Sequence, residues 1–252
     1  MESGFFSMVF RLCTVYLEVG SRLGVDSTRW VHGRWSQYFQ SLHDSEAKHG
    51  TEYHTIATVD SSPLKWTLGD YRRALHDLIR LTPSLRMDVR RVIREIGQPF
   101  TAIFVRRGDK IGTEASFISM ATILSWIPYT SDTVFFIQTD DYTVVEEARE
   151  CLPGHRIVST VPSTKRGSYH YRYYNQPVGV PWTDKTPEDA YAETCEMLVG
   201  LFVCLSAQSC WTDDTSNVGR FLKLYDDRVH VYPTDYSVDE SLHVHPAWTL
   251  RA

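Results

Sequence analysis

Charged residues gather directly behind a predicted strand in the middle of this sequence. The run Phe100–Val105 is apolar, β-branched and aromatic and follows Pro99, which is typical of a buried strand. The residues that come next include five charged side chains: Arg106, Arg107, Asp109, Lys110 and Glu114. In an open α/β sheet, ligands bind at the carboxyl ends of the strands, so we expect these side chains to face a ligand.

These residue types suit a phosphate ligand and a proton transfer. A guanidinium pairs with two phosphate oxygens at once and an ammonium adds a compact charge, so Arg106, Arg107 and Lys110 can hold a diphosphate. Because successive strand side chains point to opposite faces, only one arginine can aim at the ligand. We interpret Arg107 as structural, paired with Asp109 or a carboxylate elsewhere. Glu114 can take a proton from a hydroxyl group. The alternative is a surface loop of mutually satisfied ion pairs.

Two further polar segments follow predicted strands. Asp140 and Asp141 come after the apolar run at residues 134–137. Adjacent carboxylates without a third oxygen ligand are a poor metal site, so we predict that they bind the nucleotide or brace the arginine loop. A short strand predicted at residues 201–205 leads into Ser206, Ala207 and Gln208. The hydroxyl group and backbone N–H groups of such a turn can receive phosphate oxygens.

The rest of the chain must supply the elements that position these residues. Apolar spacing and capping residues predict helices within residues 1–21, around 71–79, from 83 to a cap at Gly97, and at 117–126, 144–151, 187–200 and 217–224. Strands are predicted at 100–105, 134–137, 156–161, 201–205 and 229–232. Alternating strands and helices indicate a parallel sheet with crossovers, on the scale of one Rossmann-like nucleotide-binding domain. We predict a mostly helical N-terminal domain at 1–98 and this Rossmann-like domain at 99–252.

A resemblance to a known family adds to this interpretation. The stretch VRRGDKIGTEASF at residues 105–117 resembles the central motif of the α-1,6-fucosyltransferases, which include core N-glycan and rhizobial nodulation-factor fucosyltransferases. Further similar segments follow in the family's order: Thr139-Asp140-Asp141, then GSYHYRY at 167–173, then Ser206-Ala207-Gln208-Ser209-Cys210. The resemblance implies an α/β, GT-B-like, inverting glycosyltransferase that transfers fucose from GDP-fucose to a hydroxyl group of a glycan acceptor. It also implies that residues 1–98 form a reduced N-terminal, acceptor-side lobe.

The resemblance also implies residue roles. Arg106 matches the arginine that binds the β-phosphate of GDP-fucose, Glu114 matches the base for the acceptor hydroxyl, and Lys110 matches its partner. A fixed guanidinium stabilises the departing diphosphate more in the transition state than in the ground state. The resembling enzymes use no metal, so we expect no metal or other cofactor. The remaining predicted contacts of the nucleotide sugar are Arg107, Asp109, Asp140, Asp141, His170, Tyr173, Ser206, Ala207 and Gln208.

The sequence gives a weaker indication of the acidic residue that would recognise the guanine base. The family places an Asp shortly before its Ser-Ser-Gln segment, at a position near Tyr191 here. Glu193 is the first acidic candidate and Asp189 the second. This chain also has Phe104 where the family has a His. These departures keep two alternatives open: a glycosyltransferase with another nucleotide-sugar donor, and a carbohydrate- or nucleotide-binding module without catalysis.

Composition limits the partners. The 252 residues are 42% hydrophobic with a net charge of −5, which suits a globular protein and argues against nucleic acid or an anionic membrane as main partner. Five cysteines without close spacing predict reduced thiols. No apolar run reaches the length of a membrane span. We therefore expect a soluble, cytoplasmic form, or the Golgi lumen if an N-terminal anchor has been removed. The expected partners are GDP-fucose and a glycan acceptor.

Overall fold

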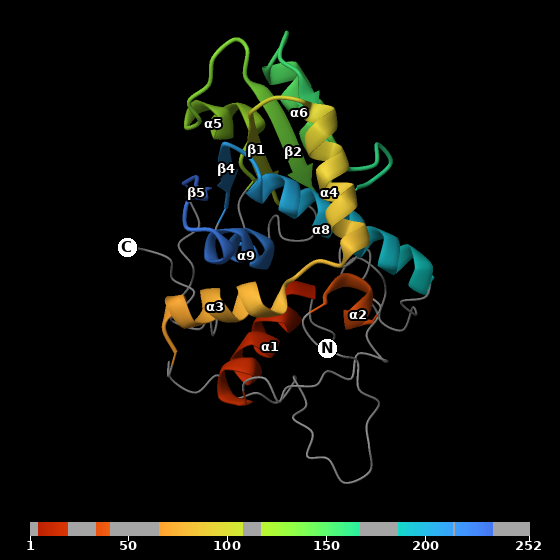
Figure 1. The fold of residues 1–252 in the computed structure, drawn as a ribbon. Helices are drawn as coiled ribbons and strands as arrows, with labels where there is room; N and C mark the ends of the chain where they lie inside the picture. Colours follow the sequence, from red (N-terminus) through yellow and green to blue (C-terminus); the bar gives the residue numbers. More distant parts are fainter. Residues whose placement is uncertain are drawn as a thin grey trace, which may run out of the picture.

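A five-stranded parallel sheet lies in the upper half of the molecule as drawn in Figure 1. The computed structural model describes residues 5–19, 34–40, 66–107, 117–166, 186–213 and 215–233. Its strands, in the spatial order β3-β2-β1-β4-β5, are β1 (Phe100–Val105), β2 (Val134–Thr139), β3 (Ile157–Val158), β4 (Ser209–Thr212) and β5 (His230–Val231). All their pairings are parallel. The strand order reverses between β1 and β4, and the carboxyl ends at such a point are where ligands bind in this architecture.

Helices precede and connect these strands. They are α1 (Phe5–Val19), α2 (Trp35–Tyr38), α3 (Leu68–Leu78), α4 (Pro83–Ile96), α5 (Met120–Ser125), α6 (Thr143–Cys151), α8 (Pro187–Leu205) and α9 (Asn217–Tyr225). Local sequence explains several of their ends. Thr67 and Asp70 form a reciprocal capping box at the start of α3. Gly97 ends α4 with a φ of 75°, a conformation that favours glycine, which confirms the predicted cap.

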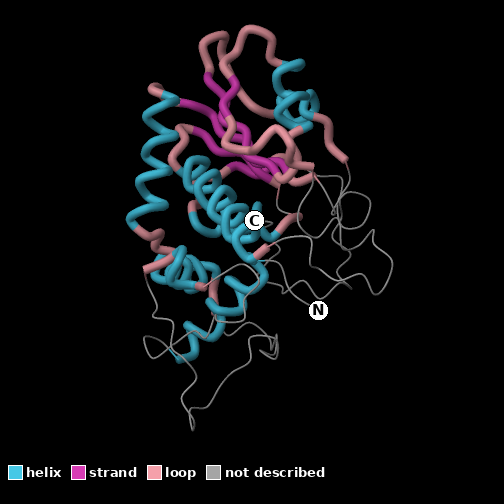
Figure 2. The backbone as a smooth tube through the Cα atoms, turned by 90° about the vertical axis from the view of Figure 1, so that its right-hand side faces the viewer, coloured by secondary structure: helices cyan, strands magenta, loops and turns pink. Residues whose placement is uncertain are grey.

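Helices cover both faces of the sheet, as Figure 2 shows. Within β1, Phe100, Ala102 and Phe104 face a larger core that is shared with α1, α3, α4, α8 and α9. The alternate residues Ile103 and Val105 face a smaller core shared with α5 and α6. All six residues of β1 and all six of β2 are buried, as expected for parallel strands between two helical layers.

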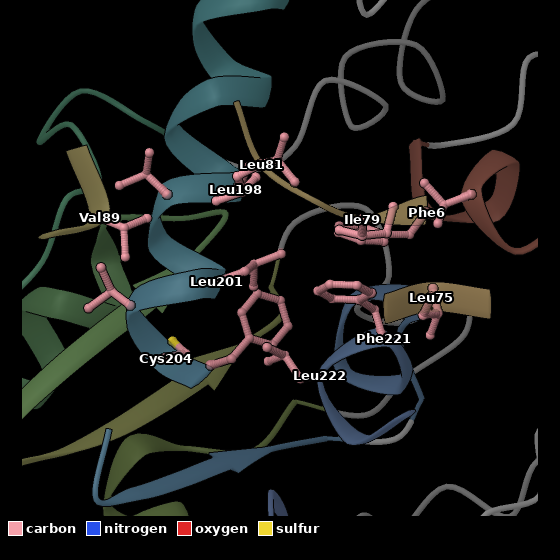
Figure 3. Close-up of a cluster of buried hydrophobic side chains, with 14 of the residues drawn as sticks. Phe6, Leu75, Ile79, Leu81, Val89, Leu198, Leu201, Cys204, Phe221 and Leu222 are labelled. Atoms are coloured by element: carbon pink, nitrogen blue, oxygen red, sulfur yellow. The ribbon is translucent and has the colours of Figure 1, made fainter. Parts of the chain in front are cut away.

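The larger core joins segments from both ends of the described chain. Figure 3 shows Phe6 of α1, Leu75 of α3, Leu201 of α8 and Phe221 of α9 converging on one another. The ring centroids of Phe6 and Phe221 are 4.4 Å apart. Helices before residue 98 therefore share one core with helices after it. The division of the chain into two domains at residues 98 and 99 stays a prediction.

The predicted α/β class with a Rossmann-like parallel sheet is confirmed. One element was wrong: residues 201–205 are the last turn of α8, and the strand that follows begins at Ser209. A short apolar run has no period that separates a strand from a buried helix. The second half of α8, residues 197–205, is apolar on all sides and lacks the polar stripe of a surface helix, because α8 packs between the sheet and α4.

Two further predictions concern the redox state of the cysteines and the presence of a membrane-spanning segment. All five cysteines are free thiols, as predicted. Burial raises the pKa of the Cys13 and Cys204 thiols well above the ordinary value, so both are protonated and unreactive at neutral pH. Within the described part of the chain, none of the helices combines the length and apolar character that a bilayer span requires.

Candidate active site

One carboxylate ties the carboxyl ends of β1 and β2 together. Val105 pairs with Thr139, so Arg106 and Asp140 follow two neighbouring strand ends. Arg106 Nη1 lies 3.0 Å from Asp140 Oδ2, and the two side chains are only 15% and 9% exposed. Asp140 Oδ1 accepts a 2.7 Å hydrogen bond from the backbone N–H of Arg107. Asp140 thus fixes both the guanidinium of Arg106 and the backbone that follows it.

The contact between Arg106 and Asp140 is an ion pair rather than an aligned hydrogen bond. Within the described residues, Asp140 Oδ2 accepts no hydrogen bond of good geometry, although a cationic nitrogen lies 3.0 Å away. The attraction between two opposite charges depends weakly on angle and is strong where water is excluded, so a separation of 3.0 Å is enough to hold the pair together. The pair therefore holds Arg106 at the strand end.

Arg107 enters a separate network on the α5 and α6 side of the sheet. Its Nη2 lies 2.9 Å from Glu147 Oε2, and its Nη1 donates a 2.5 Å hydrogen bond to the carbonyl oxygen of Ile118. Its guanidinium carbon lies 4.0 Å from the centroid of the Phe117 ring. Arg107 is 5% exposed. These contacts fit a structural role. Sequence reasoning missed Glu147, because nothing local marks a partner that is 40 positions away.

Asp141 closes the turn that leads from β2 into α6. Its Oδ1 accepts 2.9 Å hydrogen bonds from both the backbone N–H and the hydroxyl group of Thr143. Asp141 therefore supports the turn that carries Asp140. Bracing of the arginine segment, one of the two roles predicted for the pair, is seen for Asp140. Among the residues that the structure describes, no group of three His, Cys, Asp or Glu side chains is placed to hold a metal ion.

The structure corrects the position of Ser206, Ala207 and Gln208. They lie between the end of α8 and the start of β4, and the Gln208 N–H donates a 3.0 Å hydrogen bond to the Phe100 carbonyl oxygen at the start of β1. They are therefore at the amino edge of the sheet. The six residues of β1, at about 3.3 Å each, put roughly 20 Å between this edge and Arg106. These three residues do not complete a phosphate site with Arg106.

The turn between β4 and α9 occupies the place that was predicted for those residues. Asp213 Oδ1 accepts hydrogen bonds from the backbone N–H groups of Thr215, at 2.9 Å, and Ser216, at 2.7 Å. Ser216 Oγ accepts a 3.0 Å bond from the Gly219 N–H and caps α9. Because β4 is the neighbour of β1, the start of α9 lies at the same edge as Arg106. The sequence signal was Ser216 itself, a capping residue directly before the predicted helix.

Gly219 lets α9 approach this turn, and its replacement provides a test. A Cβ at Gly219 would lie 1.9 Å from the Asp213 carbonyl oxygen, which is backbone and cannot turn aside. We expect Gly219→Ala to lower the free energy of unfolding by about 2–3 kcal/mol, measured by urea denaturation. Gly69→Ala is the matched control, because its nearest neighbour would be at 3.6 Å and alanine favours the helix. Equal stability of the two variants would contradict the close packing.

Three acidic residues of α8 could hydrogen-bond to the nucleotide base. The sequence pointed to two of them and not to the third. Asp189, the second candidate, is engaged in the capping box at the start of α8. Glu193, the first candidate, is half-buried on the same helix, and its role stays a prediction. Glu196, which sequence reasoning did not consider, accepts a 2.9 Å hydrogen bond from Gln138 Nε2 near the end of β2 and pairs with Lys165. Glu196 is thus an α8 carboxylate that is bonded near the carboxyl end of the sheet.

Five of the predicted site residues lie outside the described residues. They are Asp109, Lys110, Glu114, His170 and Tyr173. The structure therefore brings Arg106, Asp140 and the start of α9 to one edge, and the catalytic roles of Glu114 and Lys110 stay predictions.

Comparison with known proteins gives one family match. The sequence profile of the family described as "Alpha-(1,6)-fucosyltransferase N- and catalytic domains" matches residues 50–180. A curated relative, the alpha-(1,6)-fucosyltransferase of Drosophila melanogaster, is 29% identical over 130 residues, which cover 47% of this chain and 20% of the relative. The chain thus spans about a fifth of the length of that relative.

Two solved structures resemble the chain more distantly. NodZ α-1,6-fucosyltransferase soaked with GDP-fucose aligns with a TM-score of 0.42 and 15% identity, over 64% of this chain and 47% of NodZ. The fucosyltransferase NodZ from Bradyrhizobium aligns with a TM-score of 0.41 and 14% identity, over 62% of this chain and 46% of that one.

Proposed function

Because this chain belongs to the family of α-(1,6)-fucosyltransferase N- and catalytic domains, we propose that it transfers fucose from GDP-fucose to a hydroxyl group of a glycan acceptor. The single observation that carries the proposal is the place of Arg106. It follows β1 directly at the carboxyl edge, beside the point where the strand order reverses. Asp140 holds its guanidinium there. A cation fixed at that point suits the diphosphate of a nucleotide sugar.

In the proposed reaction, the acceptor oxygen forms a bond to the anomeric carbon of fucose while the bond from that carbon to the diphosphate breaks. The acceptor proton goes to Glu114, with Lys110 beside it, and the electron pair of the breaking bond goes to GDP. Arg106 stabilises the charge that grows on the departing diphosphate. A direct displacement of this kind inverts the anomeric centre, and it needs no metal. The family match covers residues 50–180, a range that includes all three residues.

The N-terminal end of α9 lies near the proposed diphosphate but is expected to stabilise it only weakly. A helix start carries a partial positive charge that favours an anion. However, the Asp213 carboxylate already occupies the N–H groups of Thr215 and Ser216, and it is itself negative. The two effects oppose each other, so we assign the main neutralisation of the diphosphate to Arg106.

Titration calorimetry with GDP, GDP-fucose and UDP tests the donor. We expect GDP and GDP-fucose to bind with similar affinity and UDP to bind at least about tenfold more weakly, a difference of roughly 1.4 kcal/mol. The second candidate function, transfer from another nucleotide sugar, is favoured by one observation. Phe104, which stands where the family has a His, is a core residue only 3% exposed and offers a base no polar side-chain group. UDP binding as tightly as GDP would select that alternative, and no nucleotide binding would reject both.

A further inference from the structure

Phe117 is a large apolar ring exposed beside the candidate active site. It is 58% exposed, although most aromatic side chains of this size are buried in the described structure. It directly precedes the segment that enters α5, and its ring lies against Arg107, the second residue after β1. Phe117 therefore stands at the carboxyl edge of β1, where Arg106 and Asp140 also lie.

The ring is held in position from one side. The guanidinium carbon of Arg107 lies 4.0 Å from the ring centroid, a distance typical of a cation–π contact. Arg107 is in turn fixed by Glu147 and by the carbonyl oxygen of Ile118. Since a buried cation covers one face, most of the exposed area must come from the other face and the ring edges. A ring presented in this way binds at a low cost in conformational entropy.

Phe117 and α9 lie on opposite faces of the sheet. The Arg107 network contacts residues of the α5 and α6 layer, whereas α9 belongs to the layer on the opposite face. Arg106 follows β1, and its guanidinium lies against Asp140 at the end of β2. Phe117 is on the face of the sheet that α5 and α6 cover, and α9 is on the opposite face. In the sequence, Phe117 follows the proposed base Glu114 by three residues, and three residues span no more than about 11 Å. A molecule on the ring is therefore close to the group that would take its proton.

We propose that Phe117 stacks against a pyranose ring of the glycan acceptor and thereby positions the acceptor hydroxyl. The inference rests on the proposed function. One face of many pyranose rings presents C–H groups, and covering an exposed phenyl ring with such a face removes apolar surface of both partners from water. Phe117 would set the affinity for the acceptor, while Arg106 would set the affinity for the donor.

The test compares three variants with a linear tetramer of β-1,4-linked N-acetylglucosamine as the acceptor probe. Phe117→Leu removes the ring but keeps an apolar side chain. We expect it to raise the acceptor KM about fivefold or more, with kcat, the GDP dissociation constant and Tm nearly unchanged. Phe117→Trp should restore the acceptor KM, and its fluorescence should shift when the tetramer is added. Tyr129→Leu is the matched control, because Tyr129 is 45% exposed but lies before β2, at the amino edge.

The possible results separate this inference from the proposed function. An unchanged acceptor KM in Phe117→Leu, or no binding of the tetramer by the wild-type protein, would overturn the stacking role. Phe117→Leu could instead lower Tm and weaken GDP binding without a change in acceptor KM that Phe117→Trp restores. That result would overturn the stacking role and show that the ring only shields Arg107. Failure of the wild-type protein to bind GDP would reject the proposed function, whereas GDP binding without any effect at Phe117 would reject only the inference.

Discussion

Arg106→Ala is expected to weaken GDP binding about 100-fold and to slow fucose transfer by about 10²–10³. The binding loss reflects the removal of charge-assisted hydrogen bonds to phosphate. The rate loss reflects the charge that grows on the diphosphate as the bond to fucose breaks. Titration calorimetry with GDP and initial rates with saturating GDP-fucose measure the two effects separately. GDP binding within threefold of the wild-type value would contradict the proposed site.

The design must separate ligand binding from folding, because Arg106 also pairs with a carboxylate that is only 9% exposed. Removing one partner of a buried pair leaves the other charge uncompensated. We therefore expect Arg106→Ala alone to lower stability, and the double variant Arg106→Ala with Asp140→Asn to recover much of it. GDP binding should stay weak in both. Recovery of binding together with stability would mean that Arg106 acts only through the fold.

The neighbouring arginine is the matched control. Arg107 is 5% exposed and paired with Glu147, so Arg107→Ala should lower the free energy of unfolding by about 3–5 kcal/mol. If the variant is assayed well below its Tm, its affinity for GDP should remain close to the wild-type value. Adjacent arginines would then show opposite patterns, one in binding and the other in stability.

Glu114→Gln is expected to slow fucose transfer by about 10²–10⁴ and to leave GDP binding within about twofold, because an amide cannot accept the acceptor proton. The substitution keeps the size of the side chain and removes only its charge. Initial rates across pH provide the measurement: the fall in kcat/KM toward low pH should disappear in the variant together with most of the rate.

Glu146→Gln serves as the control for Glu114→Gln. Glu146 is half exposed, at 50%, and its closest cation in the described structure, Arg166, is 3.8 Å away, so the exchange should leave both rate and stability nearly unchanged. A Glu114→Gln rate within threefold of the wild-type value would remove Glu114 from the mechanism. GDP binding with no transfer by the wild-type protein would instead favour a binding module.

Local signals predicted most of the elements. The apolar runs of β1 and β2 and the glycine that ends α4 are recorded in a few consecutive residues, and the structure has them where they were expected. The run at residues 201–205 was misassigned, because a short apolar segment is compatible with either a buried strand or a buried helix. That one error moved the predicted phosphate turn to the wrong edge, since the turn after a helix of this sheet lies at the amino ends of the strands.

The sequence by itself determined the class of the fold and the place of Arg106, because an apolar strand followed at once by charge is a local pattern. Only the tertiary structure decided the partners: Asp140 for Arg106, Glu147 for Arg107, and the β4 to α9 turn at their edge. The two ion pairs join residues that are 34 and 40 positions apart. They depend on the order of the strands and on which helix covers which face of the sheet. No single segment of the sequence determines either of these.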